Sequence, residues 1–360
     1  MDLLETIAEL SHEFGGPEYV LGGGGNSSAK DDATLWVKPS GVTLLDLRPG
    51  DFVAMDRARI AELYTATPPA DPAAREALVK DLMLAARRSG ATGRPSVEAP
   101  LHNVFAERFV VHTHPALVNG LTCARGGAAA CARLFPEALW VPYVDPGYTL
   151  SIETRRALQR CAEQRGRAPA VVLLENHGVF VAGEDPETVR AAYARLLDAL
   201  RAEYRAARLD LDLPPPAPPT EKADAGTRAL LRELLGPAEA AHIASSGLFP
   251  PPRGPLSPDH IVYAKSYLHI GPISADSIAR FRAEHGYTPR VFATDAGVWA
   301  VGATAKEAEL ALAFARDGAR VQRLAQAFDG PQYLTERARA FIENWEVESY
   351  RRQVSITPPK

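Results

Sequence analysis

Two apolar runs that each end in histidine constrain this 360-residue chain more than any other feature. In the first, the β-branched residues of Phe109-Val110-Val111 predict a buried strand that continues into His112-Thr113-His114-Pro115. Because side chains alternate along a strand, His112 and His114 project from the same face, while Thr113 points away. The sequence therefore places two imidazoles side by side, and a metal ion would need at least a third ligand.

The second run supplies that third histidine. Residues 170–174 are apolar and lead through Glu175-Asn176 to His177 and Gly178, which predicts a strand followed by a turn. Three neutral imidazoles with an open coordination position form the ligand set of a catalytic zinc site. A single His-x-His on a strand is also common in ordinary sequence, and only the two runs together favour a metal site.

A carboxylate stands fourteen residues ahead of the first histidine. Glu98 follows Pro95-Ser96-Val97 and precedes a short helix predicted over 99–105. An acidic residue at this place could simply stabilise the helix N-terminus. Alternatively, Glu98 is a base held close to the metal, with its pKa raised by burial.

A glycine-rich stretch near the N-terminus indicates a ligand-binding loop. Residues 22–25 are all glycine and precede Asn26-Ser27-Ser28, whose polar side chains suit phosphate contacts. The stretch is not a dinucleotide fingerprint, because Ser27 stands where the third glycine of that motif would be. A flexible lead-in to a hairpin is the alternative. Strands are then predicted over 34–38 and 42–45, around the turn Pro39-Ser40-Gly41.

Composition excludes several classes of protein. A hydrophobic content of 46% and a charged content of 23% are typical of a soluble globular chain. The net charge of −4 argues against a basic nucleic-acid-binding surface. Three cysteines without metal-type spacing argue against a disulfide framework and favour a reducing cytoplasm. Neither a signal peptide nor a long apolar run is visible, so no membrane association is expected.

Periodicity and proline content divide the chain. Amphipathic helices are predicted over 3–14, 73–88, 152–164 and 186–208. A run of prolines from Pro214 to Pro219 predicts a stiff spacer. The predicted organisation is a metal-binding domain over 1–208, a linker over 209–226, a C-terminal α/β region over 227–352 and a loose tail over 353–360.

The C-terminal region partly repeats the first. Residues 176–183 align with residues 295–302, and a helix with an N-cap signal follows each segment. Ala296 stands in place of His177, and the segment 263–269 loosely resembles the histidine strand. The pattern indicates a degenerate repeat that lost its metal, or the coincidence of two strand-glycine-helix segments.

Taken in order, five motifs resemble the class II aldolase/adducin family, which includes zinc-dependent fuculose-phosphate and rhamnulose-phosphate aldolases. The motifs cover roughly residues 5–205 and are Gly24-Gly25-Asn26-Ser27-Ser28, Ser40-Gly41, Ser96-Val97-Glu98, His112-Thr113-His114-Pro115 and Asn176-His177-Gly178. The later region, with Pro258-Asp259-His260 and residues 344–351, resembles the extension of longer members. In particular, it resembles the aldolase half of bifunctional rhamnulose-phosphate aldolase/dehydrogenases.

The resemblance implies a three-layer α/β/α fold with a central, largely antiparallel sheet, and a smaller C-terminal α/β region. It also implies a homotetramer with active sites at subunit interfaces. The family usually carries a second serine before the glutamate, where this chain has Val97. A tyrosine from a neighbouring subunit donates a proton in the family, and Tyr148 and Tyr350 are candidates. The implied roles are zinc ligation by His112, His114 and His177, acid/base catalysis by Glu98, and phosphate binding by Asn26, Ser40, Gly41 and Ser96.

The implied activity is retro-aldol cleavage of a rhamnulose- or fuculose-type ketose 1-phosphate. Dihydroxyacetone phosphate and a short aldehyde would be the products, with Zn²⁺ or another divalent metal stabilising the enediolate. Epimerisation of a pentulose phosphate and decarboxylation of a sugar-acid phosphate are alternatives that use the same metal site. A third alternative is a non-catalytic adducin-like interaction protein, against which the three histidines and Glu98 argue.

Overall fold

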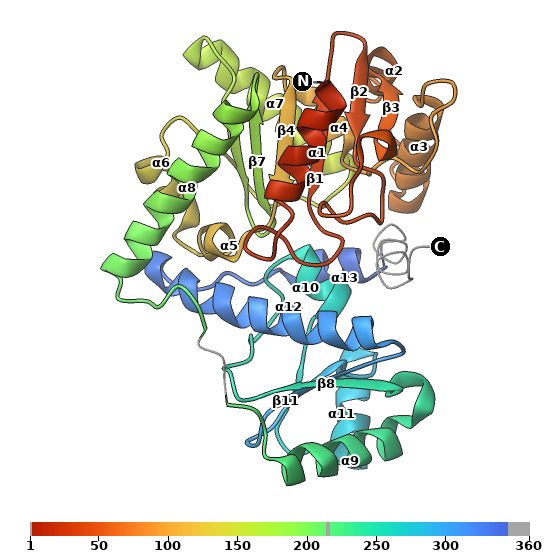
Figure 1. Cartoon of the computed structure of the whole chain (residues 1–360), viewed down its shortest axis with the longest axis vertical. Helices are drawn as coiled ribbons and strands as arrows, with labels where there is room; N and C mark the ends of the chain where they lie inside the picture. The colour runs from red at the N-terminus through yellow and green to blue at the C-terminus, as the bar shows by residue number, and fades with distance from the viewer. Residues whose placement is uncertain (1, 214–216, 345–360) are drawn as a thin grey trace. The chain divides into compact units, whose positions relative to one another are not determined.

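The computed structural model describes residues 2–213 and 217–344 of the chain (Figure 1). The described residues divide into two compact units. The first unit runs to Thr122 and resumes from Gly126 to Leu200, and the second contains Cys123–Arg125 and the residues from Arg201 onward. Each unit is built around its own sheet.

The first unit alternates short strands with helices that cover them. Its elements are α1 (Leu3–Glu13), β1 (Asn26–Lys30), β2 (Thr34–Val37), the 3-10 helix η1 (Pro49–Asp51), β3 (Val53–Asp56), α2 (Arg57–Glu62), α3 (Pro72–Ala85), α4 (Ala99–Val104), β4 (Phe109–Thr113), α5 (Ala116–Thr122), α6 (Gly127–Leu134), β5 (Leu139–Val141), α7 (Tyr148–Arg165), β6 (Val171–Leu174), β7 (Gly178–Gly183) and α8 (Pro186–Ala206), whose last turns enter the second unit.

A seven-stranded sheet in the order β3-β2-β1-β4-β7-β6-β5 forms the middle of this unit. Every neighbouring pair is antiparallel except β5 and β6. The prediction of a mixed α/β fold with a central, largely antiparallel sheet is therefore confirmed. Strand β4, which carries the first histidine, is a central strand between β1 and β7 and is buried along its whole length.

Helices cover both faces of the sheet, and the alternation of side chains shows which helices belong to which face. Val110 of β4 shares a hydrophobic core with Leu101 of α4 and Leu158 of α7. Thr113, three residues further along β4, points to the opposite face, where its hydroxyl hydrogen-bonds the hydroxyl of Tyr193 on α8 at 2.8 Å. Helix α1 also lies on the Thr113 face, because its Ser11 contacts Ser27 of β1 at 2.7 Å. Figure 1 shows this three-layer arrangement.

One predicted strand of this unit is wrong. Residues 42–45 form no strand, although 34–37 does. Gly41 adopts φ +88°, which turns the chain away from β2, and the Nζ of the buried Lys38 donates to the carbonyl of Val42 at 2.6 Å. Leu44 is buried there while Leu45 is 52% exposed, so the apolar pattern reflects a packed loop rather than a strand.

The second unit is smaller and is built around four strands in the order β8-β11-β10-β9. Its elements are α9 (Glu221–Glu239), β8 (His242–Ser246), α10 (Pro258–Ala264), β9 (His269–Ile270), α11 (Ala275–His285), β10 (Val291–Ala293), β11 (Val298–Gly302), α12 (Ala305–Leu324), the 3-10 helix η2 (Ala325–Phe328) and α13 (Glu336–Asn344).

This sheet has the same pairing pattern as strands β4-β7-β6-β5 of the first unit. In each set the first two pairs are antiparallel and the last is parallel. A helix joins the two parallel strands in both, and a long helix, α8 or α12, follows the strand after the glycine. The counterpart of β4 is thus β8, rather than the predicted segment 263–269. A common origin of the two sets stays a prediction.

The register of this second sheet identifies the residues that stand where the histidines would be. Trp299 pairs with Ser245 as Phe180 pairs with His112. The counterpart of His114 is therefore Gly247, and that of His177 is Ala296. At these positions the second sheet carries no imidazole.

Part of the predicted linker is held in place within the second unit. Arg316 and Arg320 of α12 donate to the carbonyls of Leu213 at 2.8 Å and Leu211 at 2.7 Å. Helix α9 begins at Glu221, inside the predicted span 209–226. Residues 214–216 and the tail predicted over 353–360 lie outside the described residues, and the domain boundaries stay predictions.

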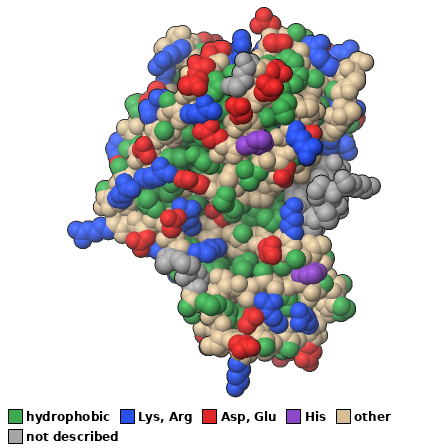
Figure 2. Space-filling model, in the orientation of Figure 1, with side chains coloured by type: hydrophobic (Ala, Val, Ile, Leu, Met, Phe, Trp, Pro, Cys, Tyr) green, Lys and Arg blue, Asp and Glu red, His purple; other side chains and the backbone are tan. Residues whose placement is uncertain are grey.

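On the face shown in Figure 2, Lys and Arg side chains are interspersed with Asp and Glu. The three cysteines are free thiols, and each is buried. Among the described residues, no helix is both long and apolar enough to cross a membrane.

Candidate metal centre

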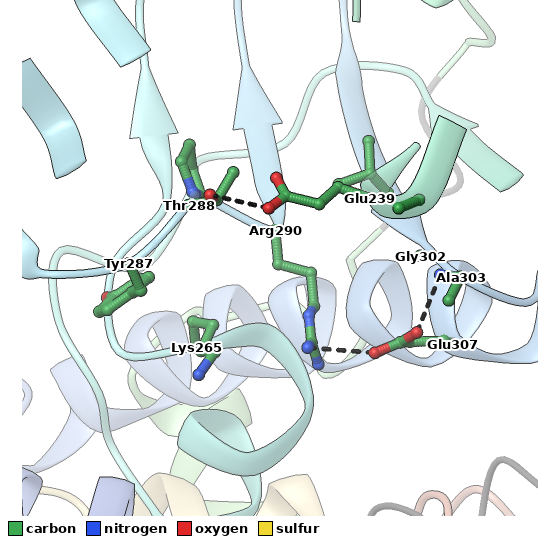
Figure 3. Close-up of a pocket in the computed structure, with 11 residues that line it drawn as sticks. Glu239, Lys265, Tyr287, Thr288, Arg290, Gly302, Ala303 and Glu307 are labelled. Carbon is green, nitrogen blue, oxygen red and sulfur yellow. Dashed lines mark hydrogen bonds and ion pairs between the residues drawn. The ribbon is translucent and has the colours of Figure 1, made fainter. Parts of the chain in front are cut away.

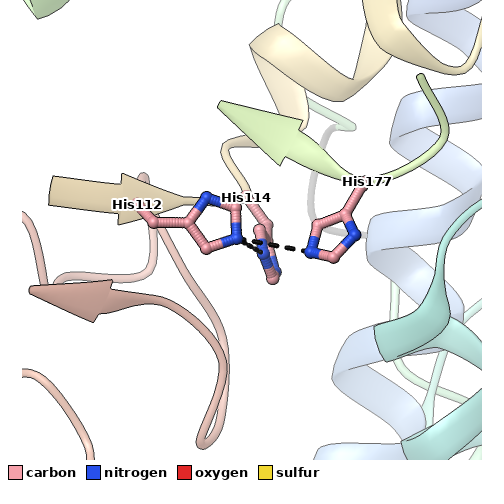
Figure 4. A group of neighbouring side chains, drawn as sticks. All are labelled: His112, His114 and His177. Atoms are coloured by element: carbon pink, nitrogen blue, oxygen red, sulfur yellow. Dashed lines mark hydrogen bonds between the residues drawn. The ribbon is translucent and has the colours of Figure 1, made fainter. Parts of the chain in front are cut away.

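The pairing of β4 with β7 brings the three histidines together. His112 is the penultimate residue of β4 and stands opposite Phe180, while His177 immediately precedes β7, so that both lie at the same end of the two strands. His114 follows β4 by one residue and returns to the face of His112. The Nε2 atom of His112 is 2.9 Å from that of His114 and 3.3 Å from that of His177 (Figure 4). The ligand atoms of all three lie within 4.8 Å of one another.

Hydrogen bonding and packing fix the ring of His112. Its Nδ1 lies 2.9 Å from the carbonyl of Val179, which can only accept, so Nδ1 carries the proton. Nε2 is then left with a lone pair that faces the other two rings. The ring stacks on Phe180 with a centroid distance of 3.9 Å and is fully buried.

Backbone geometry positions the other two rings. The amide of His114 donates to the carbonyl of Tyr19 at 3.0 Å. His177 lies in a tight turn, where Asn176 has φ +54° and the amide of His177 donates to Leu174 at 3.2 Å. At Gly178, a Cβ atom would lie 2.5 Å from Cδ2 of His114 and 2.5 Å from the carbonyl of Thr113. Only glycine therefore allows the turn to approach β4 this closely.

Glu98 faces the histidines instead of capping its helix. It occupies the N-cap position of α4, yet its side chain accepts no capping hydrogen bond. Its Oε1 lies 3.5 Å from the Nε2 atoms of both His112 and His177. Oε2 accepts a hydrogen bond from the side-chain amide of Asn26, a residue that the β1–β4 register places opposite His112. The structure thus brings together five of the predicted site residues, which are the three histidines, Glu98 and Asn26.

The charge state of this cluster differs from the sequence expectation. Burial raises the pKa of the Glu98 carboxyl, but His112 and His177 outweigh burial and hold this pKa well below its usual range. The sequence predicts a raised pKa for Glu98 because it indicates that the residue is buried but not how close the histidines lie. Burial also lowers the pKa of His112, against the opposing effect of Glu98. The cluster is therefore an anionic carboxylate beside an imidazole that favours its neutral form.

These residues fit a divalent cation. Neutral imidazole is the ligand form of histidine, and three such nitrogens beside a carboxylate form a donor set with net negative charge. Lone pairs that face one another in a buried space are unfavourable unless a cation or proton lies between them. In addition, the buried Oδ1 atom of Asn26 has no hydrogen-bond partner among the described residues.

The structure also brings the other predicted phosphate-binding residues close to Glu98. Segments 38–40 and 94–96 pair, with the Ser40 amide donating to Arg94 at 2.8 Å and the Ser96 amide to Lys38 at 3.2 Å. The amide of Glu98 donates to the Ser96 hydroxyl at 3.2 Å. Gly41 turns the chain beside them with φ +88°. Phosphate binding at these residues stays a prediction.

One buried residue of this region was not predicted. His102 follows Glu98 by one helical turn, is fully buried, and contacts the Ser28 hydroxyl through Nδ1 at 2.8 Å. Burial holds its pKa well below the usual range. The available signal was its i+4 spacing from Glu98, but a single histidine on an apolar helix resembles an ordinary core residue. Of the tyrosine candidates, Tyr148 begins α7, and Tyr350 lies outside the described residues.

Comparison with known proteins gives consistent matches to the first unit. The family model for the class II aldolase and adducin N-terminal domain matches residues 5–204. An uncharacterized oxidoreductase, YuxG, of Bacillus subtilis is 31% identical over 198 residues, which are 51% of this chain and 27% of that protein. Methylthioribulose-1-phosphate dehydratase of Mus musculus is 27% identical over 194 residues, which are 51% of this chain and 75% of that protein. The chain thus spans about a quarter of the Bacillus relative.

Solved structures align with just over half of the chain. An N-terminal class II aldolase domain from Thermoplasma acidophilum aligns with a TM-score of 0.48 and 20% identity, over 55% of this chain and 92% of that one. A sugar-phosphate aldolase from Thermotoga maritima aligns with a TM-score of 0.41 and 14% identity, over 57% of this chain and 95% of that one.

Proposed function

Because this chain belongs to the class II aldolase and adducin family, we propose that it is a metal-dependent lyase acting on a sugar phosphate. The specific proposal is cleavage of a rhamnulose- or fuculose-type ketose 1-phosphate to dihydroxyacetone phosphate and a short aldehyde. The observation that carries it is the convergence of three imidazole nitrogens with Glu98, whose Oε1 lies 3.5 Å from two of them. A non-catalytic interaction protein would not need this buried and electrostatically costly cluster.

His112, His114 and His177 would hold the metal, which we propose to be Zn²⁺. When bound, this ion would act as a Lewis acid toward the carbonyl of the substrate. The role of the protein is to keep the three rings in one orientation, which the Val179 carbonyl does for His112. A pre-set ligand group needs no rearrangement on binding, so the site is ready for the substrate.

Glu98 would move the proton. Its low pKa leaves it ionised in the resting site, and it can therefore accept the hydroxyl proton of the carbon that becomes the aldehyde when the carbon–carbon bond breaks. It would then return this proton to the carbon that keeps the electron pair, so the carboxylate is regenerated. Asn26 donates to Oε2 and leaves Oε1 facing the histidines, so Oε1 would be the oxygen that accepts the proton.

Ser40, Gly41 and Ser96 would bind the substrate phosphate. Ser40 and Ser96 lie on two paired segments, and Gly41 directly follows the first of them. The Ser96 hydroxyl accepts a hydrogen bond from the backbone amide of Glu98. Binding energy at the phosphate would thus be used to orient the reacting carbons near the carboxylate. We further propose a homotetramer in the cytoplasm, which binds neither nucleic acid nor membrane and completes its sites between subunits.

Dehydration of a ketose phosphate is a second candidate, favoured by the similarity to the mouse methylthioribulose-1-phosphate dehydratase. In that reaction the base removes a proton from carbon, and a hydroxyl leaves from the adjacent carbon. The same site also serves the epimerase and decarboxylase alternatives, since all of them stabilise negative charge next to a carbonyl.

The experiment is a substrate panel on one preparation of the zinc-loaded protein. Rhamnulose 1-phosphate, fuculose 1-phosphate and methylthioribulose 1-phosphate would be supplied separately, and products followed by mass spectrometry. Dihydroxyacetone phosphate from either of the first two supports the aldolase. Loss of water from the third without carbon–carbon cleavage would replace the aldolase with the dehydratase. Absence of product from all three would overturn both candidates.

A further inference from the structure

The second unit contains a cavity of about 740 Å³ whose charged lining is entirely basic. No aspartate or glutamate of the described chain lines it, while three arginines do. This volume lies within the range of small-molecule sites in proteins. The three arginines are Arg125, Arg253 and Arg323.

Backbone contacts hold the first arginine at this cavity. Ala124 forms an isolated bridge with Pro331, and the amide of Arg125 donates to the carbonyl of Gly330 at 3.0 Å. The Arg125 side chain then donates through Nε to the carbonyl of Asp329 at 2.8 Å. A Cβ atom at Gly330, where φ is +84°, would lie 2.7 Å from the guanidinium of Arg125. The glycine therefore leaves room for this side chain.

Gln322 contacts two further residues that line the cavity. Its Oε1 accepts from the backbone amide of Arg253 at 2.9 Å and from the hydroxyl of Tyr333 at 2.5 Å. Burial raises the pKa of Tyr333, and the guanidinium groups of Arg253 and Arg125 both oppose that rise. The two arginines, far apart in sequence, thus act on the same hydroxyl group.

The third arginine is only partly neutralised. Arg323 pairs with Asp210 at 2.6 Å, but Asp210 is 77% exposed, and an exposed pair of this kind contributes little. The cavity therefore gathers positive charge from three chain segments. Such like charges repel one another unless an anion lies among them.

The rest of the wall is apolar. Phe249 lines the cavity and is buried, and Leu248 beside it is 55% exposed, one of the few large apolar side chains left in solvent among the described residues. Pro250 and Pro331 extend this surface with rigid rings. Apolar walls with a few charged groups are the usual composition of a small-molecule site.

We propose that this cavity binds an amphipathic organic anion, with a phosphate or carboxylate among the arginines and an apolar body against Leu248, Phe249 and Pro250. Guanidinium suits this role because its planar array of donors matches both head groups. The residues that line this cavity belong to the second unit and the histidines to the first, and the proposal goes beyond the lyase activity.

A second cavity in the same unit lacks this imbalance (Figure 3). It measures about 340 Å³ and is lined by Arg290 and Lys265 together with Glu239 and Glu307. Arg290 pairs with Glu307 at 3.1 Å, and both side chains are largely buried. Charges already matched within the protein give no comparable reason for a bound anion.

The test uses four probes that separate head group from body. The intrinsic fluorescence of 1-naphthyl phosphate, 1-naphthoate and uncharged 1-naphthol would be titrated with the full chain, and inorganic phosphate would be added as a competitor. We expect one or both naphthyl anions to bind at least tenfold more tightly than 1-naphthol. Which anion binds better identifies the head group. Equal binding of 1-naphthol and both anions, or no binding at all, would overturn the proposal.

Two variants locate the binding. Arg253→Ala and Arg125→Ala should each weaken anion binding at least tenfold, whereas Arg280→Ala on the exposed face of α11 should leave it unchanged. The conservative Arg253→Lys should restore part of the affinity if positive charge is what matters. Unchanged binding in both cavity variants would place the probe elsewhere and refute the site.

The first-unit variant His112→Ala is the control for the metal centre. It should retain anion binding, so that this result does not depend on whether the proposed lyase activity is correct.

Discussion

At the scale of single residues, the central feature is a carboxylate whose neighbours decide its charge. Glu98 is buried, yet two histidines keep its pKa low, so in the proposed reaction it would start ionised and act as a base. Replacing it with glutamine preserves shape and removes the proton acceptor. Glu98→Gln should retain zinc and lose turnover by about 10²–10⁴-fold, the usual contribution of a general acid–base.

The comparison variant for this loss is Glu153→Gln, which changes a more exposed carboxylate on α7. It should keep wild-type turnover. Zinc content and initial rates would be measured on the same preparations. If Glu98→Gln turned over at the wild-type rate, Glu98 would have no place in the mechanism.

A second residue-scale prediction concerns Lys30, which is 2% exposed and donates to the carbonyl of Phe105 at 3.0 Å. Burial, assisted by Arg57, lowers its pKa from 10.5 to about 7. Between these two values the unfolded chain keeps the proton that the folded chain has lost. The contribution of Lys30 to stability therefore rises with pH from about 7 to about 10, and protonation below pH 7 carries the full penalty.

The variant Lys30→Met removes this titration. The free energy of unfolding of the variant minus that of the wild type should be larger at pH 6 than at pH 9, by roughly 2–3 kcal/mol, because the variant lacks the penalty that wild type carries at pH 6. Urea unfolding at the two pH values measures the difference, with the exposed Lys222→Met as control. A wild-type-to-variant difference that is the same at both pH values would show that Lys30 does not titrate in this range.

At the scale of elements, the turn between β6 and β7 determines whether the histidines meet. In Gly178→Ala, the added methyl group would collide with the carbonyl of Thr113 and the ring of His114, each at 2.5 Å. We expect a loss of about 1–3 kcal/mol in stability and weaker zinc binding. Gly226→Ala in α9 is the matched control, since a Cβ there meets nothing within 4 Å. That change should stabilise by about 0.5–1 kcal/mol. Equal effects of the two changes on zinc binding would contradict the role of the turn.

The same scale shows what sequence can predict. The strand that contains His112 and the turn at His177 are predictable because apolar runs and a glycine mark them locally. The apolar pattern of 42–45 predicts a strand wrongly, because a loop with alternating burial has the same pattern, and the backbone of Gly41 and the Lys38 contact that redirect the chain are not evident from sequence. Strand β8 was not predicted, because His242–Ser246 is mostly polar and pairs only through β11.

The candidate site was predictable in its residues and less so in its electrostatics. Three spaced histidines and Glu98 could be selected from their motifs, and the structure brings them within reach of one another. The low pKa of Glu98 depends on distances to His112 and His177 that sequence does not contain. The bond from Asn26 to Glu98 likewise follows from the register of β1 with β4.

At the scale of the whole molecule, four strands of the first sheet share a pairing pattern with the second sheet, but only the first sheet has histidines at the three metal-site positions. Metal binding should therefore stabilise the first unit selectively, since a ligand stabilises the structure that binds it. Removing zinc should speed amide hydrogen exchange in peptides covering β4 and the 175–178 turn, and leave those covering β8 and β11 unchanged. Hydrogen-exchange mass spectrometry with and without chelator tests this. Faster exchange in β8 and β11 alone would contradict it.

The most direct test of the metal-dependent lyase is a single cycle of metal removal and return. Protein stripped by chelator and then reloaded with Zn²⁺ would be assayed for dihydroxyacetone phosphate release from rhamnulose 1-phosphate and fuculose 1-phosphate. The histidine cluster predicts that stripping abolishes release and that stoichiometric zinc restores it. Release that persists in the stripped protein, or zinc-loaded protein that releases none, would contradict the assignment.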